Sequence, residues 1–424
     1  MLVEFKFSNF RSFKSEVVFS MEPVSLNGNN YNVVETNLKK IPQIYRSSGI
    51  FGANASGKSN LFKALFVFQK IIKSSHKADL DKELFVDSYA LSAKNSNEPT
   101  FFEISFVVEG VFYRYGFKYN KKEVLEESLY QSDISESGTA REKRIFIRNG
   151  KNVEKSAGIK QSWIDELASN RLFLSELINL RSCKLDNILA VYSYLVNNIK
   201  ITENTTSRGI SFDMIKEGKG QGVLNLVKKA DLGLDDIFVK NVDKEEVAKM
   251  MAEVSESDNK VKKAFLEMIF SDNEDVYDIK SSHIAEDGKK KEFDFDDMES
   301  KGTKVFLAII GPVVKALEKG AALFVDEIDA SLHPLLIKHL VSIFNSSDSN
   351  PNNAQLIFTS HAHYLMDGDY LTRDQIWFTS KENNNGFSSE LYSLSDFDEN
   401  RKKKSFYESY MYGVYGALPK IKEL

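Results

Sequence analysis

The sequence predicts an α/β fold with a mixed sheet, an N-terminal antiparallel β-lobe and a mainly helical insertion. Three observations predict it. Apolar and polar residues alternate through parts of the first 120 residues, which is the period of half-buried strands. A glycine-rich loop at residues 52–59 joins a short apolar run to a helical pattern. After residue 290, short apolar runs again alternate with helical patterns, which is typical of buried strands and the helices that cover them.

The N-terminal lobe is predicted from period-two patterns. Val3, Phe5 and Phe7 alternate with polar residues and predict a first strand, and the apolar run at 17–21 can pair back with it. Residues 101–119 predict a hairpin that turns at Glu109-Gly110. These segments together favour an antiparallel sheet.

The loop at residues 52–59 reads Gly-Ala-Asn-Ala-Ser-Gly-Lys-Ser and satisfies the P-loop pattern G-x-x-x-x-G-K-[ST]. A triphosphate needs a concave row of backbone N–H groups, and glycine lets the backbone approach closely enough to form it. We expect Lys58 to reach the β- and γ-phosphates and Ser59 to offer its hydroxyl to Mg²⁺. The apolar run at 48–51 before the loop and the helical pattern at 61–72 after it indicate a strand–loop–helix unit. Such a unit places phosphates at a helix N-terminus.

The middle of the chain favours helices. Apolar residues follow helical spacing at 160–200, and further helical patterns occupy 244–255 and 259–270. Strands are expected at 276–284 and 292–295, with a turn at Asp287-Gly288.

Two buried strands in the last third each end in polar residues. The apolar run at 321–325 is followed by Asp326-Glu327, the arrangement of a Walker B pair, in which Asp326 would hold Mg²⁺ and Glu327 would orient the attacking water. Two carboxylates after an apolar strand can also be a solvated strand end. The run at 355–358 is followed by Thr359-Ser360-His361, which places His361 where it can contact a γ-phosphate. Between the two strands, a helix is expected at 335–345.

A helix start precedes the Walker B strand at Ser300-Lys301-Gly302-Thr303. A serine and a glycine at a helix start form an anion-binding cap, although taken alone this is an ordinary N-cap. The order of P-loop, Ser-x-Gly cap, Asp-Glu strand and His strand favours a nucleotide hydrolase.

At this point the chain resembles the ABC-type ATPases of the SMC/RecF-like branch. Ser300 and Gly302 resemble their signature motif, Asp329 falls in their D-loop, and His361 matches their switch histidine. Residues 9–13, Asn-Phe-Arg-Ser-Phe, resemble the N-terminal strand-turn that helps to seat the nucleotide. The resemblance implies a P-loop NTPase of ABC-ATPase type that needs a second copy, because the signature of one protomer covers the γ-phosphate bound by the other. It also implies three regions: the N-terminal half of the ATPase domain at 1–120, an insertion at 121–290 that is a candidate partner-binding region, and the C-terminal half of the ATPase domain at 291–424.

The site that the resemblance implies uses ATP and Mg²⁺. Its catalytic residues are Glu327, Lys58 and His361, and its Mg²⁺ ligands are Ser59 and Asp326. Its nucleotide-binding residues are Arg11, Ser12, Gly52, Asn54, Ala55, Ser56, Gly57, Lys58, Ser59, Asn60, Ser300, Gly302 and Asp329. The glutamine that ABC-type ATPases place near Mg²⁺ is not assigned.

A closer resemblance is to bacterial RloA/AbiL-type AAA family ATPases. The segments that carry it are 51–60, 113–117, 172–175, 299–303, 374–378 and 412–419. Val414 stands where relatives carry an arginine. The resemblance implies an antiphage, abortive-infection ATPase that controls a separate effector, with a TOPRIM-like nuclease as the candidate, since the residues after His361 are too few for a fused TOPRIM domain.

Composition narrows the remaining functions. The formal net charge of −5 gives no overall basic field, and the single Cys183 excludes an internal disulfide. No apolar run is long enough to span a membrane, so we expect a soluble, cytoplasmic protein without a membrane partner. The alternative function is a RecF/SMC-like DNA-binding ATPase in DNA maintenance or repair, for which Lys-rich stretches at 289–291 and 401–404 are the candidate nucleic-acid contacts. A P-loop kinase is a third possibility, but the Asp-Glu pair and the distant signature element suit hydrolysis with switching better than transfer to a small acceptor.

Overall fold

The computed structural model describes residues 1–24, 32–79, 83–132, 142–203, 208–230, 232–241, 277–367, 370–381, 387–397 and 405–419. The chain divides into two compact units. The first consists of Met1–Asn204 and Lys315–Leu424, and the second of Thr205–Val314. This division differs from the boundaries expected at residues 120 and 290. The helical patterns at 244–255 and 259–270 and the Lys-rich stretch at 401–404 lie outside the described residues.

The N-terminal lobe of the first unit is a seven-stranded antiparallel sheet in the order β10-β9-β8-β7-β6-β1-β2. Phe5 pairs with Phe19, and the expected hairpin forms between β6 and β7, so both predictions are confirmed. The sheet continues through β8, β9 and β10 past residue 120, where the sequence had suggested a mainly helical segment. The strands are β1 Leu2–Ser8, β2 Val17–Ser20, β6 Thr100–Val108, β7 Val111–Tyr119, β8 Val124–Ser132, β9 Glu142–Asn149 and β10 Asn152–Lys155.

The second sheet of this unit is mixed, in the order β11-β15-β16-β5-β17-β18. Neighbouring strands from β11 to β17 pair parallel, and β18 pairs antiparallel with β17. The predicted strands before the P-loop, before Asp326-Glu327 and before His361 are therefore three adjacent parallel strands. The strands are β5 Ser47–Phe51, β11 Ile199–Glu203, β15 Ala322–Asp326, β16 Gln355–Thr359, β17 Ile376–Lys381 and β18 Ser389–Ser393, and a separate pair is formed by β3 Val33–Glu35 and β4 Gln43–Tyr45.

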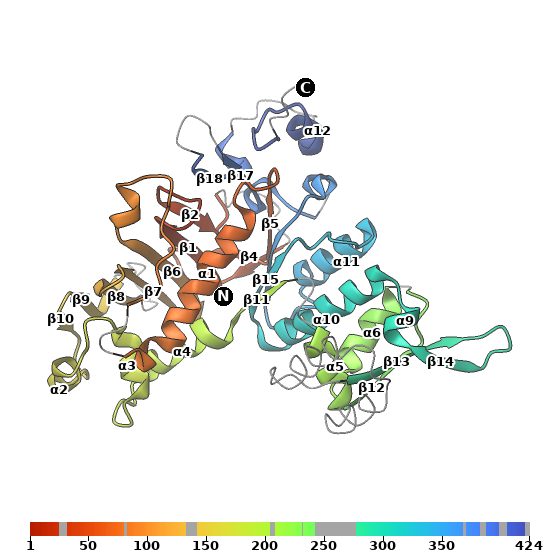
Figure 1. The fold of residues 1–424 in the computed structure, drawn as a ribbon, viewed down its shortest axis with the longest axis horizontal. Helices are drawn as coiled ribbons and strands as arrows, with labels where there is room; N and C mark the ends of the chain where they lie inside the picture. Colours follow the sequence, from red (N-terminus) through yellow and green to blue (C-terminus); the bar gives the residue numbers. More distant parts are fainter. Residues whose placement is uncertain are drawn as a thin grey trace, which may run out of the picture. The chain divides into compact units, whose positions relative to one another are not determined.

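Helix α1, Lys58–Ser74, packs against both sheets of the first unit (Figure 1). The ring of Phe68 lies 5.5 Å from that of Phe117 in the antiparallel lobe, and the ring of Phe62 lies 5.2 Å from that of Phe324 on β15. The helix that follows the P-loop is thus fixed by aromatic packing on two sides.

The other helices of the first unit include those expected within 160–200 and at 335–345. They are α2 Gln161–Asp165, α3 Phe173–Asn179, α4 Asp186–Asn197, α11 Pro334–Asn345 and α12 Phe406–Met411. Short 3₁₀ turns lie at Ser75–Lys77, Asn95–Asn97, His363–Met366, Arg373–Gln375 and Leu394–Asp396. The antiparallel lobe beside the mixed sheet is the arrangement that the ABC-type resemblance implied, and the predicted fold class is confirmed.

The second unit combines helices with a three-stranded sheet, β12-β13-β14. The predicted hairpin forms between β13 and β14, and Gly288 lies in its turn with a φ of 76°. The elements are α5 Arg208–Lys216, α6 Gln221–Lys229, β12 Asp236–Asn241, β13 Tyr277–Ile284, β14 Lys290–Asp294, α9 Phe295–Met298 and α10 Lys301–Lys319, the last of which runs on into the first unit.

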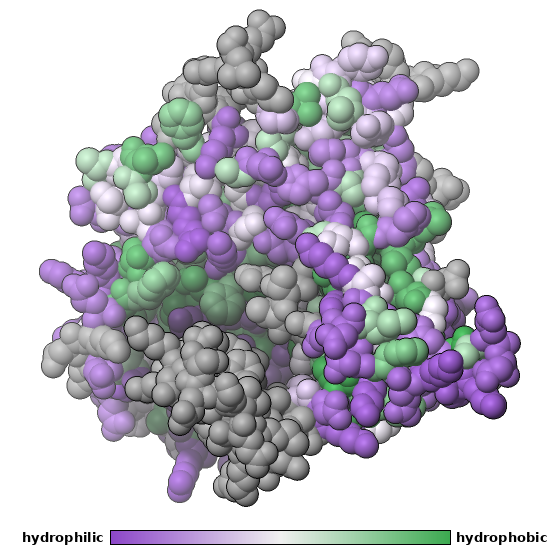
Figure 2. All heavy atoms as spheres, turned by 45° about the vertical axis from the view of Figure 1, so that its right-hand side comes forward, coloured by the Kyte–Doolittle hydropathy of each residue, from purple (hydrophilic) through white to green (hydrophobic). Residues whose placement is uncertain are grey.

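Hydrophilic side chains predominate among the described residues on the face drawn in Figure 2, with apolar side chains gathered in smaller areas. Within the described ranges, no helix has both the length and the apolar character needed to cross a membrane.

Candidate functional site

The P-loop joins β5 to α1 and depends on two glycines. Gly52 and Gly57 have φ values of 147° and 125°, a region that side-chain-bearing residues rarely adopt. A Cβ on Gly52 would lie 2.3 Å from the carbonyl oxygen of Thr379, and a Cβ on Gly57 would lie 2.7 Å from Oγ of Ser389. A side chain at either position would therefore collide with the segment on the far side of the loop, and both positions require glycine.

Replacing Gly57 with alanine should distort the loop, because the new Cβ meets a serine hydroxyl and the backbone is held in a strained region that costs about 1–3 kcal/mol. Gly110 is the matched control, since its φ is 75° but nothing lies within 4 Å of the point that an added Cβ would occupy. We expect Gly57→Ala to weaken ATP binding, measured by calorimetry, while Gly110→Ala affects only the unfolding temperature. Equal ATP affinity in both variants would contradict this role of Gly57.

Lys58 lies at the start of α1 and its side chain is buried. Its Nζ donates hydrogen bonds to the carbonyl oxygens of Gly52, at 2.7 Å, and Ala53, at 3.1 Å. Burial lowers the pKa of Lys58, and the carboxylates of Asp326, Glu327 and Asp329 oppose that shift. The lysine of the P-loop and the acidic residues after β15 therefore share one electrostatic environment.

Thr359 organises the Walker B pair. Its hydroxyl donates to Oδ1 of Asp326 at 2.5 Å and accepts the backbone N–H of Glu327 at 2.7 Å. Glu327 has a φ of 51°, an uncommon conformation for a residue with a side chain, and the N–H of Ile328 is held by the carbonyl oxygen of Thr359 at 3.0 Å. The turn after β15 is thus fixed by the end of its parallel neighbour, β16.

His361 and Asp329 are joined directly. The backbone N–H of His361 donates to both carboxylate oxygens of Asp329, at 3.1 and 3.2 Å. Burial and the neighbouring Lys58 lower the pKa of His361, while the carboxylates of Asp329, Glu327 and Asp326 raise it. The net lowering favours a neutral imidazole at pH 7, which can accept or donate a hydrogen bond.

The turn at residues 9–13 contacts the first turn of α1. Oγ of Ser12 accepts from Nδ2 of Asn60 at 2.8 Å, and it also bonds Oγ of Ser389 at 2.8 Å. Arg11 reaches Oδ1 of Asn60 at 3.5 Å and pairs with Asp87 at 2.5 Å. The turn therefore lies against the first turn of the P-loop helix, and its expected part in seating the nucleotide stays a prediction.

The C-terminal segment also contacts the P-loop. The N–H of Ala53 donates to the carbonyl oxygen of Ala417 at 3.0 Å, and the ring of His363 stacks on Tyr410 with centroids 4.4 Å apart. Burial, His361 and Lys58 lower the pKa of His363 to about 4. A pocket of about 920 Å³ lies here, lined by residues 52–56 of the P-loop, His361, His363, parts of β17 and β18, residues 396–397 and 410–411, and residues 414–419.

The oxygen donors expected for Mg²⁺ are Ser59, in the first turn of α1, and Asp326, at the end of β15. Among the described residues, no group of three or more His, Cys, Asp or Glu could hold a metal ion. This donor set fits Mg²⁺, which keeps several waters and is typically bound by one or two protein groups together with phosphates.

The structure brings most of the predicted site residues together at one edge of the mixed sheet. Ser300 and Gly302 lie in the second unit, at the start of α10, and their role stays a prediction. Residues at the site that the sequence patterns did not indicate include Thr359, Thr379, Ser389 and Ala417. Thr359 was visible as the end of its apolar run, but its role was not, because its hydrogen bonds depend on β16 lying next to β15.

Two solved structures of SMC head domains are similar to this chain. One is the SMC head domain of Thermotoga maritima, with 12% identity, coverage of 92% of this chain and 98% of that chain, and a TM-score of 0.40. The other is an Smc head domain of Pyrococcus furiosus, solved bound to the C-terminal domain of ScpA, with 15% identity, coverage of 92% and 96%, and a TM-score of 0.32. Neither likeness supports a functional conclusion. A comparison with curated proteins finds no match.

One family model covers more than half of the chain, from residue 47 to residue 367, and so includes the P-loop, the Walker B pair and His361. The chain belongs to the family described as "AAA domain, putative AbiEii toxin, Type IV TA system".

Proposed function

We propose that this protein is an ATP-hydrolysing switch of an antiphage, abortive-infection defence system, which closes as an ATP-dependent head-to-tail dimer and controls a separate effector. The observation that carries the proposal is the shared environment of Lys58, the Asp326-Glu327 pair and His361 at one sheet edge. Family membership supports an ATPase. The dimer, the effector and the defence role go beyond that.

The hydrolytic roles follow from the hydrogen bonds. Lys58 would neutralise the phosphate charge, and Glu327, held by its N–H bond to Thr359, would orient the attacking water. His361, fixed to Asp329, would contact the γ-phosphate and respond to its loss. Ser59 and Asp326 would hold Mg²⁺, which supplies further neutralisation of the phosphate oxygens.

Dimerisation is proposed from the signature element. Ser300 caps α10, because its Oγ accepts the N–H of Thr303 at 3.1 Å and its carbonyl oxygen accepts the N–H of Lys304 at 3.1 Å. A capped helix start with Gly302 in its first turn suits a γ-phosphate. In the proposed dimer, Ser300 and Gly302 act on the nucleotide of the partner copy, in an arrangement with two-fold symmetry.

The effector and the defence role rest on the RloA/AbiL-type resemblance, because ATPases of that type are typically paired with a separate protein. A TOPRIM-like nuclease is the candidate. The family description, with its reference to a toxin–antitoxin system, also points to a function exercised together with a second protein.

Glu327→Gln is expected to trap an ATP-bound dimer, because the amide keeps the geometry but no longer activates water. Light scattering after gel filtration in saturating ATP measures the mass, and the double variant Lys58→Ala/Glu327→Gln should remain monomeric. Purification of tagged Glu327→Gln from its native host with ATP then identifies the effector. Monomers of Glu327→Gln would refute the dimer, and duplex DNA recovered without a protein partner would refute the proposed effector.

The DNA-maintenance alternative gains no support from the described Lys-rich stretch. Lys289 lies 3.6 Å from Asp287, and Lys290 pairs with Asp235 at 2.5 Å. Acidic neighbours thus offset the charge of this hairpin, and such exposed pairs are ordinary solvated contacts. Duplex binding that is both salt-sensitive and ATP-dependent would favour this alternative.

A further inference from the structure

The exposed face of α1 is basic along its whole length. On α1, three lysines and one phenylalanine follow one another at spacings of three and four residues, which places Lys63, Phe66, Lys70 and Lys73 on one side of the helix. Lys77 ends the 3₁₀ turn that follows α1. The four lysines are exposed, and Phe66 is 54% exposed. No Asp or Glu occurs from residue 58 to residue 77.

Three further lysines lie beside the C-terminal end of α1. Nε2 of Gln69 donates to the carbonyl oxygens of Leu195 and Ile199, at 2.6 and 3.1 Å, which fixes α1 against the start of β11. Nδ2 of Asn198 reaches the carbonyl oxygen of Lys319 at 3.4 Å, which brings the end of α10 to the same place. Lys200, Lys315 and Lys319 therefore extend the row of lysines from α1.

Lys200 lies close enough to three of these lysines to feel their positive charges. The pKa of Lys200 is lowered by burial and by the positive charges of Lys73, Lys319 and Lys315. Across the described residues, none of the lysines on α1, nor Lys200, Lys315 or Lys319, forms an ion pair with a carboxylate. Elsewhere in the unit, by contrast, Lys6 lies 2.7 Å from Glu4.

The helix dipole explains only part of this pattern. Cations are favourable in the last turn of a helix, which accounts for Lys73 on α1 and Lys319 on α10. It does not account for Lys63, near the start of α1, or for Lys200 on a strand. A row of lysines without ion-paired carboxylates, in a protein of net charge −5, favours an anionic ligand.

We propose that this basic face, defined as Lys63, Phe66, Lys70, Lys73, Lys77, Lys200, Lys315 and Lys319, binds single-stranded nucleic acid. Lys63 to Lys73 span about 15 Å along the helix axis, enough to follow several phosphates of one strand. The exposed ring of Phe66 can stack on an unpaired base, which a duplex does not offer. An anionic membrane is a poorer fit, because the apolar face of α1 is buried in the core and only Phe66 is available for insertion.

The inference is independent of the proposed ATPase cycle, since none of these residues belongs to the nucleotide site. Binding of fluorescent single-stranded RNA and DNA and of a matched duplex is measured by anisotropy over a series of salt concentrations, without nucleotide. We expect Lys63→Gln/Lys70→Gln/Lys73→Gln to reduce the slope of log affinity against log salt by about two. The control Lys121→Gln/Lys122→Gln/Lys151→Gln removes the same charge from exposed lysines of the antiparallel lobe and should leave the slope unchanged.

Phe66→Ala tests the preference for a single strand. It should weaken single-strand binding about fivefold or more and leave the weaker duplex binding unaltered. The proposal is overturned if the wild type binds no oligonucleotide, if both triple variants lose affinity equally, or if duplex binds as well as single strands. It is also overturned if phosphatidylserine vesicles, and not oligonucleotides, bind through the three lysines. ATPase activity unchanged in the triple variant would separate this face from the hydrolytic site.

Discussion

Replacing Lys58 with alanine is expected to reduce ATP hydrolysis by about 10²-fold or more, the usual consequence of removing a positioned donor to transition-state charge. The side chain is only 6% exposed and lies in the field of Asp326, Glu327 and Asp329. Without Lys58, these carboxylates would repel the phosphates that the loop is shaped to bind. Phosphate release under saturating ATP measures the effect.

The fold should tolerate this change, because among the described residues the side chain bonds only the carbonyl oxygens of Gly52 and Ala53. Far-ultraviolet circular dichroism checks that expectation. Lys151→Ala, an exposed lysine between β9 and β10, is the control and should hydrolyse ATP at the wild-type rate. A Lys58→Ala variant that retains full activity would show that hydrolysis, if present, comes from another site.

Short-range patterns allowed the nucleotide-binding half of the fold to be predicted. The P-loop is contiguous, and the strands before it and before Asp326 and His361 are apolar runs that end in the residues of interest. Their spatial order was not predicted, since nothing in the individual runs reveals that β15, β16 and β5 are neighbours. Thr359 shows the limit, because its importance depends on hydrogen bonds to the next strand.

Features that rest on distant pairings were not predicted. Strands β8 to β10 continue the N-terminal sheet, although a mainly helical insertion was expected to begin at residue 121. Residue Ala417 reaches Ala53 across most of the chain length. The row of lysines on α1 was visible as a spacing, but its lack of acidic partners depends on β11 and α10.

The clearest case is a buried ion pair between β8 and β9. Glu127 and Arg148 are both about 1% exposed, although charged residues in a sequence predict a surface. Oε1 of Glu127 accepts the hydroxyl of Tyr115 at 2.9 Å and the N–H of Leu174 at 3.0 Å, and Oε2 accepts the N–H of Phe173 at 2.6 Å. Burial raises the pKa of Glu127, and Arg148 opposes that shift.

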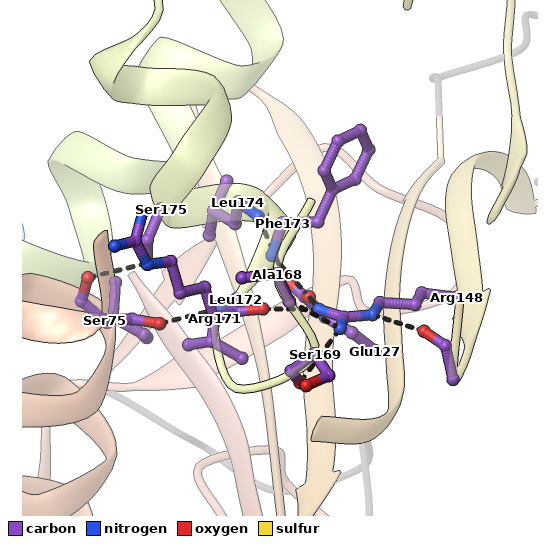
Figure 3. Close-up of polar contacts among 12 residues, drawn as sticks. Ser75, Glu127, Arg148, Ala168, Ser169, Arg171, Leu172, Phe173, Leu174 and Ser175 are labelled. Atoms are coloured by element: carbon purple, nitrogen blue, oxygen red, sulfur yellow. Dashed lines mark hydrogen bonds and ion pairs between the residues drawn. The ribbon is translucent and has the colours of Figure 1, made fainter. Parts of the chain in front are cut away.

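Arg148 joins the antiparallel lobe to the loop before α3 (Figure 3). Its guanidinium donates to the carbonyl oxygens of Gly150, Ala168, Ser169 and Arg171, and lies 3.6 Å from Oε2 of Glu127. The same loop is tied to the end of the P-loop helix, where Oγ of Ser75 accepts the N–H of Leu172 at 2.7 Å. Arg148 therefore helps to fix the loop that the C-terminal end of α1 contacts.

Arg148→Met is expected to lower the free energy of unfolding by about 3–5 kcal/mol, because it leaves a buried carboxylate without its counter-charge and several buried carbonyl oxygens without donors. Arg144→Met on the same strand is the matched control. Arg144 pairs with Glu154 at the surface, so its loss should cost less than about 1 kcal/mol. Urea unfolding followed by tryptophan fluorescence measures both.

A double-variant cycle separates the ion pair from the rest of the network. Glu127→Gln alone leaves Arg148 buried without its ion-pair partner, whereas Glu127→Gln/Arg148→Met removes both members of the pair. The double variant should therefore be destabilised by less than the sum of the two single variants. Strict additivity would mean that the backbone carbonyls, rather than Glu127, are the partners that make Arg148 necessary. Equal losses of unfolding free energy for Arg148→Met and Arg144→Met would mean that burial of this pair contributes nothing to holding the lobe against the P-loop helix.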